Sequence, residues 1–166
     1  MFNIKGVHGV WFKEPTAEGS AFVYDLDDTL LSRVGAEPHL VPLDKRQTDQ
    51  DDAYILTYRP TGYNKRTLSD IAPIKGKLVG LFTRDAQYYP FEKSDVDTFK
   101  YKISVLSKLC SLYKRVLFFE NKQVIVTAAA HSNLSGLACY LVNIKVEGGL
   151  ETIVKTKIWS TVLIQK

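Results

Sequence analysis

The sequence has few of the residues that most often build metal centres and disulfide frameworks. Its 166 residues include only two cysteines, Cys110 and Cys139, and three histidines, His8, His39 and His131. None of the five has the close spacing of zinc ligands, so we expect no zinc site and interpret both cysteines as reduced core thiols. Reduced thiols favour an intracellular protein, and we expect a cytoplasmic one.

Long apolar runs and glycine-rich loops are missing as well. Residues 1–15 contain no apolar run long enough for a secretory signal, and no later run approaches a membrane span, so we expect no membrane partner. A glycine-rich phosphate loop is also missing, which argues against a nucleotide-binding kinase. The net charge of +4 and the sequence pI near 9.0 are compatible with a polyanionic partner.

Apolar runs and helical periodicities alternate along the chain, which predicts one α/β domain over residues 1–166. The expected fold is a three-layer, Rossmann-like α/β domain with a mostly parallel sheet. The polar segment 33–52 is the expected long loop. We expect strands at 9–12, 21–27, 53–58, 77–84, 115–120, 139–147 and 151–164, and helices at 64–71, 96–113 and 124–137.

The stretch FVYDLDDTLLS leads an apolar strand directly into three carboxylates. Asp25 and Asp27 are two residues apart, so on a strand they share a face, while Asp28 begins the turn. In open α/β sheets the active site lies beyond the carboxyl ends of the strands. Carboxylates this close repel each other unless a divalent cation joins them or they divide the roles of nucleophile and general acid. The alternative is a loop of solvated acids or a helix N-cap.

Three further motifs follow in the chain. YILTYRP places Thr57 at the end of a strand, TFKYK offers Lys100, and RVLFFENK ends another strand with Glu120 and Asn121. Together with DLDDTL, these motifs resemble in order, strand placement and spacing those of the haloacid dehalogenase superfamily of phosphotransferases. The resemblance covers residues 22–122.

This resemblance implies a magnesium-dependent phosphomonoesterase. Asp25 would be the nucleophile that forms an aspartyl-phosphate, and Asp27 the general acid and base. Thr57 would hold a phosphate oxygen, and Lys100 would neutralise charge on the phosphate and on the nucleophile. Mg²⁺ would take oxygens from Asp25, from the Asp27 carbonyl, and from Glu120 or Asn121.

Two positions depart from this pattern. Asn121 stands where the superfamily usually carries a metal-binding Asp, and a neutral amide contributes no charge, which puts activity in doubt. Glu120 and Asn121 can also be read as an ordinary polar strand end. Lys102 rivals Lys100 for the catalytic role, and most lysines on such a basic helix are simply solvated.

The resemblance also bears on the substrate class, because superfamily members with a large inserted cap domain usually act on small molecules. The segments 30–52 and 57–100 leave no room for a large inserted domain, and an open site suits macromolecular ends. The stretch from TFKYK to FFENK, with LTYRP, is similar to the Swiss-army-knife RNA-repair-like haloacid dehalogenase domains. That similarity implies a phosphatase of RNA or DNA ends, with Thr29, Arg59 and Lys102 as candidate substrate-binding residues.

Basic and aromatic residues near the expected site are compatible with single-stranded nucleic acid, although ordinary packing explains any one of them. Two alternatives stay open: a phosphatase of phosphoproteins or small phosphate esters, and a weakly active protein that keeps the fold for binding. The residues concerned are Arg59, Lys65, Arg66, Arg84, Lys93, Lys100, Lys102 and Lys122, with Tyr58, Tyr63, Tyr88, Tyr89, Phe91 and Tyr101.

Overall fold

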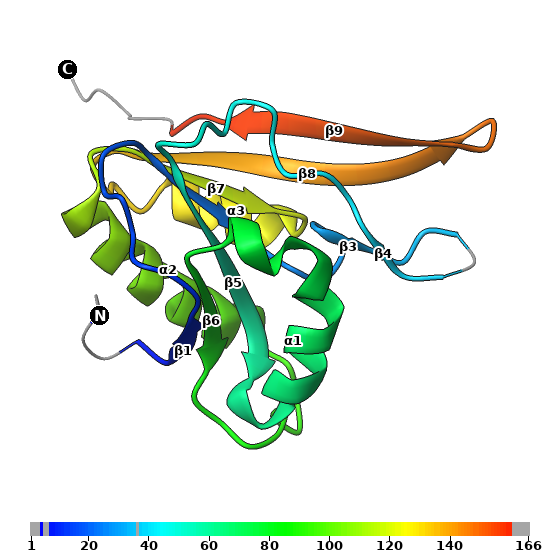
Figure 1. Cartoon of the computed structure of the whole chain (residues 1–166), viewed down its shortest axis with the longest axis horizontal. Helices are drawn as coiled ribbons and strands as arrows, with labels where there is room; N and C mark the ends of the chain where they lie inside the picture. Colours follow the sequence, from blue (N-terminus) through cyan, green and yellow to red (C-terminus); the bar gives the residue numbers. More distant parts are fainter. Residues whose placement is uncertain (1–3, 5–6, 36, 161–166) are drawn as a thin grey trace.

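A computed structural model describes residue 4 and residues 7–35 and 37–160. It is an α/β fold in which seven strands form one mixed sheet in the order β1-β6-β5-β2-β7-β8-β9 (Figure 1). The strands of this sheet are β1 (Gly9–Trp11), β2 (Ala21–Tyr24), β5 (Asp52–Pro60), β6 (Gly80–Arg84), β7 (Val116–Glu120), β8 (Leu137–Glu147) and β9 (Leu150–Ile158).

The five central strands, from β6 to β8, run parallel to their neighbours, and β1 and β9 add antiparallel edges. A two-stranded hairpin, β3 (Leu31–Ser32) with β4 (His39–Leu40), follows β2, whereas β5, β6 and β7 are each followed by helical segments. The helices are α1 (Asn64–Ile71), α2 (Asp95–Leu112) and α3 (Gln123–Ala130), with 3-10 turns at Thr61–Tyr63 and Ala72–Lys77.

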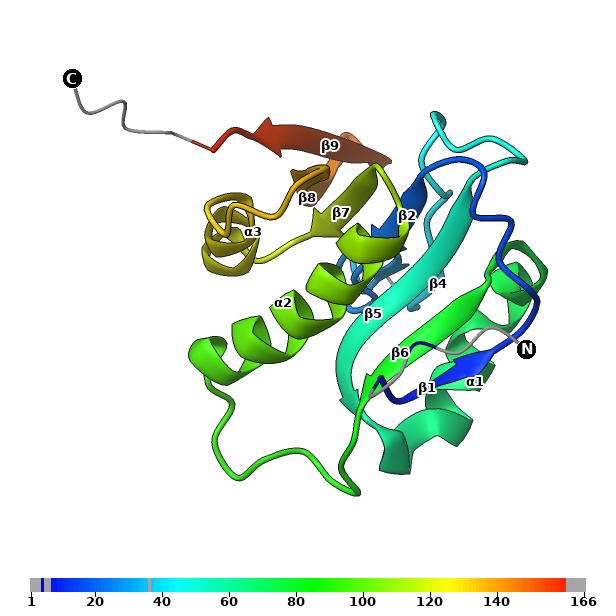
Figure 2. The same ribbon diagram turned by 90° about the vertical axis from the view of Figure 1, so that its left-hand side faces the viewer.

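The sheet is buried on both faces, so the fold has three layers (Figure 2). Alternate side chains of β2 show this: Ala21 and Val23 belong to one core, and Phe22 and Tyr24 belong to the other. Helices α2 and α3 cover the first face, whereas α1, the β3–β4 hairpin and the segment after it cover the second. Continuous apolar strands are typical of a parallel sheet covered in this way.

The sequence located most elements correctly. Helix α1 has the bounds that were expected, and α2 differs by one residue at each end. The helix expected at 124–137 ends at Ala130, because Asn133 and Gly136 adopt left-handed backbone conformations (φ 62° and 82°) that interrupt a helix. β8 therefore begins earlier than predicted, and residues 161–164 of the last predicted strand lie outside the described residues.

Two further expectations concern the cysteines and membrane spans. Cys110 and Cys139 are both free; Cys139 is buried in the core beneath α2 and α3, as expected of a core thiol, whereas Cys110 is only partly buried and packs against that core. Among the described residues, no helix combines the length and the apolar character that crossing a membrane requires.

Candidate active site

The residues that follow β2 form a tight turn that directs polar groups to the carboxyl edge of the sheet. The Leu26 carbonyl accepts hydrogen bonds from the amides of Thr29, Leu30 and Leu31 at 2.9–3.2 Å. These three leucines are buried and anchor the turn. Asp28 takes a left-handed conformation (φ 63°), which Asp tolerates better than most residues.

A buried lysine joins two carboxylates at this edge. Lys102 Nζ donates to Asp25 Oδ1 and to Glu120 Oε1, both at 2.7 Å. Asp25 follows β2 directly, Glu120 ends the neighbouring strand β7, and Lys102 lies on α2 above them. All three side chains are almost fully buried, so the lysine is the main compensation for two desolvated charges.

Burial and neighbouring charge shift the pKa values of this triad in different directions. Burial raises the pKa of Asp25 well above its ordinary value and the Glu120 charge adds to this rise, whereas Lys102 opposes it. Burial acts against the charged form of Lys102, but the two carboxylates raise its pKa overall. For Glu120, burial is outweighed by Lys102, and the pKa falls. Asp25 is therefore the carboxylate that more readily takes up a proton.

The lysine in this position is Lys102 and not Lys100. The buried face of α2 contains Thr98, Lys102, Val105 and Leu109, which are spaced by three or four residues as one helix face requires. Lys100 is exposed and does not line the cleft around Asp25. Lys102 thus makes the contact with Asp25 that was expected of Lys100. The two lysines lie on different faces of α2 because they are two residues apart in the helix.

Asp27 is held by arginines. Arg59 Nε donates to Asp27 Oδ2 at 3.0 Å and Arg59 Nη2 donates to Oδ1 at 2.8 Å, while Arg33 Nη2 donates to Oδ1 at 2.7 Å. Arg59 is buried, and its Nη1 also donates to Asp70 at 2.7 Å. Burial would raise the pKa of Asp27, but the hydrogen bonds and charges of the two arginines outweigh it and lower the pKa.

Four polar groups converge at this edge: Asp25, Glu120, the Asp27 carbonyl and Asn121. One side-chain amide atom of Asn121 lies 2.8 Å from Asp25 Oδ2, 2.9 Å from Glu120 Oε2 and 3.2 Å from the Asp27 carbonyl oxygen. With its NH₂ in this place, Asn121 can donate two hydrogen bonds among these three acceptors. With its oxygen there, Asn121 would lie 2.8–3.2 Å from three other oxygens, close to the separation of about 2.9 Å between adjacent Mg²⁺ ligands whose metal–oxygen bonds are near 2.0–2.1 Å.

This donor set fits a magnesium ion through two carboxylates, an amide and a main-chain carbonyl. The Asp27 side chain points to the arginines instead, so only its carbonyl faces the other donors. No group of three or more His, Cys, Asp or Glu side chains that could hold a metal occurs in the described part of the chain. The set is thus poorer in charge than a three-carboxylate site.

The two threonines predicted for the site are both buried beside it. Thr29 Oγ1 donates to Asp25 Oδ2 at 3.0 Å, so it orients the carboxylate. Thr57 lies in β5 where the pairing with β6 is irregular, and its Oγ1 accepts from the Arg59 amide at 3.1 Å. Irregularities of this kind re-aim side chains next to functional sites.

A narrow cleft of about 140 Å³ opens onto these groups. Asp25, Asp27, Thr57, Arg59, Lys102, Glu120 and Asn121 line it, together with Asp28, Tyr58, Tyr89, Lys93, Thr98 and Lys122. The structure thus brings together every residue predicted for the site except Lys100, which stays outside, and Thr29, which lies behind Asp25.

The expected aromatic and basic residues separate into two groups. Tyr58 is buried and packs against Tyr101 and the Arg84 guanidinium, so these residues serve packing. The side chains of Tyr88, Tyr89 and Phe91, by contrast, are exposed on the loop between β6 and α2, and Tyr63 packs against Tyr89 at the same rim.

Sequence reasoning missed Arg33 and Asp70. Asp70 faces Arg59 from α1, three residues after Thr67, which also contacts that guanidinium. The i, i+3 spacing of two polar residues on a predicted helix was the available signal. Arg33 contacts Asp27 because the β3–β4 hairpin folds back towards the turn after β2. No local sequence pattern predicts this contact.

Comparison with family models, with curated proteins and with solved structures finds no match for this chain. The geometry of the site itself is therefore the basis for assigning a function.

Proposed function

We propose that this protein is a Mg²⁺-dependent phosphomonoesterase of the haloacid dehalogenase type, acting through an aspartyl-phosphate on Asp25. The observation that carries the proposal is the buried Lys102 that bridges Asp25 and Glu120 at the ends of two adjacent parallel strands. A cation buried against a carboxylate in a cleft suits the chemistry of a nucleophile that must approach an anionic phosphate.

Asp25 would attack phosphorus. In the first step a bond forms between an Asp25 oxygen and phosphorus while the ester P–O bond breaks, and the leaving oxygen takes up a proton. In the second step water attacks the same phosphorus, the Asp25–phosphorus bond breaks and phosphate leaves. Thr29 orients Asp25 throughout, and Thr57 would donate its hydroxyl hydrogen to a phosphate oxygen.

The surroundings of Asp27 support its proposed role as a general base more than its proposed role as a general acid. Two arginines stabilise its ionised form, which suits a base that removes a proton from water. The same arginines oppose protonation, so a leaving group that needs an acid would require Asp27 to separate from Arg59. Esters with good leaving groups should therefore react fastest.

Magnesium, when bound, would neutralise the charge that develops on the transferring phosphoryl group. Asp25 Oδ2, the Asp27 carbonyl, Glu120 and the Asn121 amide oxygen are the groups that would hold it. The side chain of Asn121 must then present its oxygen and give up its hydrogen bonds to the carboxylates.

Nucleic-acid ends are the substrate class that we propose. The segment between β2 and β5 contains only a hairpin and a loop among its described residues, which keeps the cleft accessible to a large substrate. Lys93, Lys122 and Tyr89 line the cleft, and the exposed rings of Tyr88 and Phe91 lie on the same loop. Cations for the backbone and rings for bases are the elements that hold single strands.

One observation favours a second candidate, a binding protein of the same fold. The Asn121 NH₂ can donate two hydrogen bonds among Asp25, Glu120 and the Asp27 carbonyl, and Glu120 Oε2 also accepts from the main-chain amides of Asn121 and Lys122, so these groups can be held without a metal. A protein with such a site would bind phosphorylated ends without cleaving them.

The deciding experiment measures phosphate release with and without Mg²⁺. Its substrates are oligonucleotides with a 3′- or a 5′-phosphate, a phosphopeptide and an aryl phosphate. Asp25→Asn is compared with the wild type and with Asp49→Asn, a matched change in an exposed loop. Release that requires Asp25 and Mg²⁺ supports the proposal. If all four substrates stay intact with folded protein, the phosphatase proposal is wrong and the binding protein becomes the better account.

A further inference from the structure

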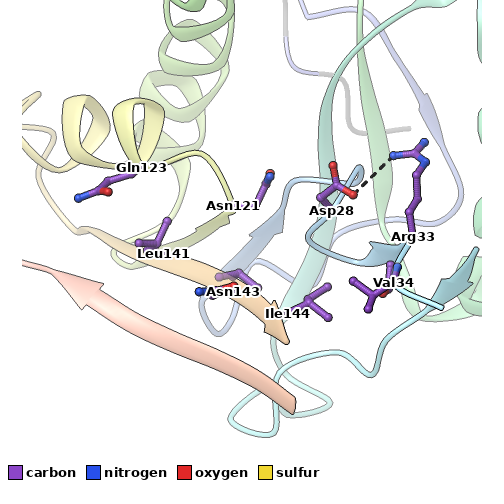
Figure 3. Close-up of a pocket in the computed structure, with 10 residues that line it drawn as sticks. Asp28, Arg33, Val34, Asn121, Gln123, Leu141, Asn143 and Ile144 are labelled. Carbon is purple, nitrogen blue, oxygen red and sulfur yellow. Dashed lines mark hydrogen bonds and ion pairs between the residues drawn. The ribbon is translucent and has the colours of Figure 1, made fainter. Parts of the chain in front are cut away.

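A second hollow lies directly beside the cleft. Its volume is about 440 Å³, against about 140 Å³ for the cleft itself, and Asp28 and Asn121 line both. In Figure 3, these two residues stand across the hollow from Asn143 and Ile144 of β8. The hollow is therefore the space that a substrate would enter beyond its phosphate.

The sizes of the two spaces suggest a division of roles. The cleft holds little more than a phosphate group, whereas pockets for whole small molecules measure about 300–1,000 Å³. The hollow falls within that range. Asp28 and Asn121 stand at the border of both spaces, so a molecule with its phosphate at Asp25 would extend past them to place its remainder in the hollow.

The chemistry of the lining indicates a neutral ligand with several hydrogen-bonding edges. Gln123 and Asn143 contribute side-chain amides, and Val34, Leu141 and Ile144 contribute aliphatic surface. Amide side chains match the paired donors and acceptors of nucleobases, and aliphatic groups pack against the faces of the rings. The carboxylate of Asp28 can accept hydrogen bonds from ribose hydroxyls.

Charge argues against an acidic peptide in the same place. Arg33 is the only cation that lines the hollow among the described residues, and it is already engaged by Asp27 at 2.7 Å and by Asp28 at 3.8 Å. A second anionic group would find no unpaired cation there. A nucleoside brings no charge and meets no such penalty.

The wall formed by the β3–β4 hairpin is held in place. Ser32 Oγ donates to Glu151 Oε2 at 3.0 Å, and His39 Nε2 lies 2.7 Å from the same oxygen, so both hairpin strands are tied to β9. A wall fixed before binding lowers the entropy cost of ordering it around a ligand.

We propose that this hollow binds the terminal nucleoside of the phosphorylated substrate, with its base between the amides of β8 and α3 and its sugar at Asp28. The assignment rests on the proposed function for the identity of the phosphate, but nucleoside binding needs neither metal nor catalysis.

The test observes the side-chain NH₂ groups of Gln123 and Asn143 by ¹⁵N–¹H NMR on the full chain without metal. Adenosine, guanosine, cytidine and uridine are titrated, with ribose and a phosphoserine peptide as comparison ligands. At least one nucleoside should shift both NH₂ signals, and ribose should not. Asn143→Leu should weaken the binding of that nucleoside about tenfold, because the hydrogen bonds between the amide and the base are lost. Gln50→Leu, which removes an exposed amide near the opposite end of the sheet, should leave its affinity unchanged.

A kinetic readout separates this proposal from the proposed function. Ile144→Trp fills the hollow and should raise KM for a phosphorylated oligonucleotide, while KM for acetyl phosphate, whose leaving group is small, stays the same. Nucleoside binding without phosphate release from any substrate would support the nucleoside site and overturn the proposed phosphatase activity. Phosphate release without nucleoside shifts, shifts caused by the peptide alone, or equal effects of Asn143→Leu and Gln50→Leu would each overturn the nucleoside site.

Discussion

Arg59 donates two parallel hydrogen bonds to Asp27, from Nε at 3.0 Å and from Nη2 at 2.8 Å, although only 5% of Arg59 is exposed. The same guanidinium reaches Asp70 with its third nitrogen, so one arginine joins the turn after β2 to helix α1. This bidentate arrangement fixes both the charge and the direction of Asp27.

Replacing Arg59 with Met should destabilise the fold more than replacing Arg33 with Met. Two carboxylates lose their buried partner, but both are partly exposed and Asp27 keeps Arg33, so the cost should stay below the figure of about 3–5 kcal/mol for a fully buried pair. Urea unfolding at neutral pH measures this loss. Arg33→Met removes the exposed partner of Asp27 and should cost less than about 1 kcal/mol. Because the pKa of Asp27 is lowered in the fold, its stabilising contribution is present above the unfolded value and disappears as the pH falls. The difference between Arg59→Met and the wild type should therefore shrink below about pH 4.

Lys102→Met should abolish phosphate release and make stability depend on pH, whereas Lys100→Met should change neither. Without Lys102, the pKa values of Asp25 and Glu120 rise in the folded protein. Groups with raised pKa values stabilise the fold at low pH and lose that contribution as the pH rises. Unfolding at pH 5 and pH 8 checks this: Lys102→Met should approach the wild type at pH 5 and fall behind at pH 8. Equal effects of the two lysine variants would contradict the placement of Lys102.

Asn121→Asp should strengthen magnesium binding. The added carboxylate supplies the charge that the amide lacks, and it removes the NH₂ group that competes with the cation. A Mg²⁺ titration followed by thermal unfolding measures this, since a ligand at one hundred times its Kd adds about 2.7 kcal/mol. Mg²⁺ should raise the thermal stability of the variant more than that of the wild type, and the variant should be less stable than the wild type without Mg²⁺. Combining Asn121→Asp with Asp25→Asn should remove this extra stabilisation by Mg²⁺. If the extra stabilisation persists, the ion binds elsewhere.

Neither cysteine should react with Ellman's reagent at neutral pH in the folded protein. Burial raises the pKa of Cys110 to about 11 and that of Cys139 to about 12, so almost no thiolate is present. Both should react at once in urea, with a stoichiometry of two thiols per chain. Rapid reaction of either thiol without denaturant would show that the core beneath α2 and α3 opens readily.

The sequence could predict the elements better than their contacts. Uniformly apolar strands such as VLFFE announce a doubly covered sheet, and the strand ends at Asp25 and Glu120 follow directly from it. The choice between Lys100 and Lys102 depended on which face of α2 packs on the sheet. The apolar pattern gave that face only approximately, because Thr98 and Lys102 are themselves buried there.

The partners of Asp27 could not be predicted for a different reason. Arg33 and Asp70 come from a hairpin and a helix whose positions depend on packing across the second core. Long-range pairs of this kind have no local signature in the chain. The hollow beside β8 was hidden in the same way, because its wall is a hairpin that the sequence reads as a polar loop.

Lys102 and Asp25 are 77 residues apart in the chain, and the strands that carry Asp25 and Glu120 meet only after the β5, β6 and α2 crossover has closed. No contiguous fragment shorter than this crossover can contain the triad. The site therefore belongs to the completed topology: a chain caught partway through synthesis carries Asp25 long before it has Lys102 and Glu120, so the three side chains meet only once the central sheet is whole.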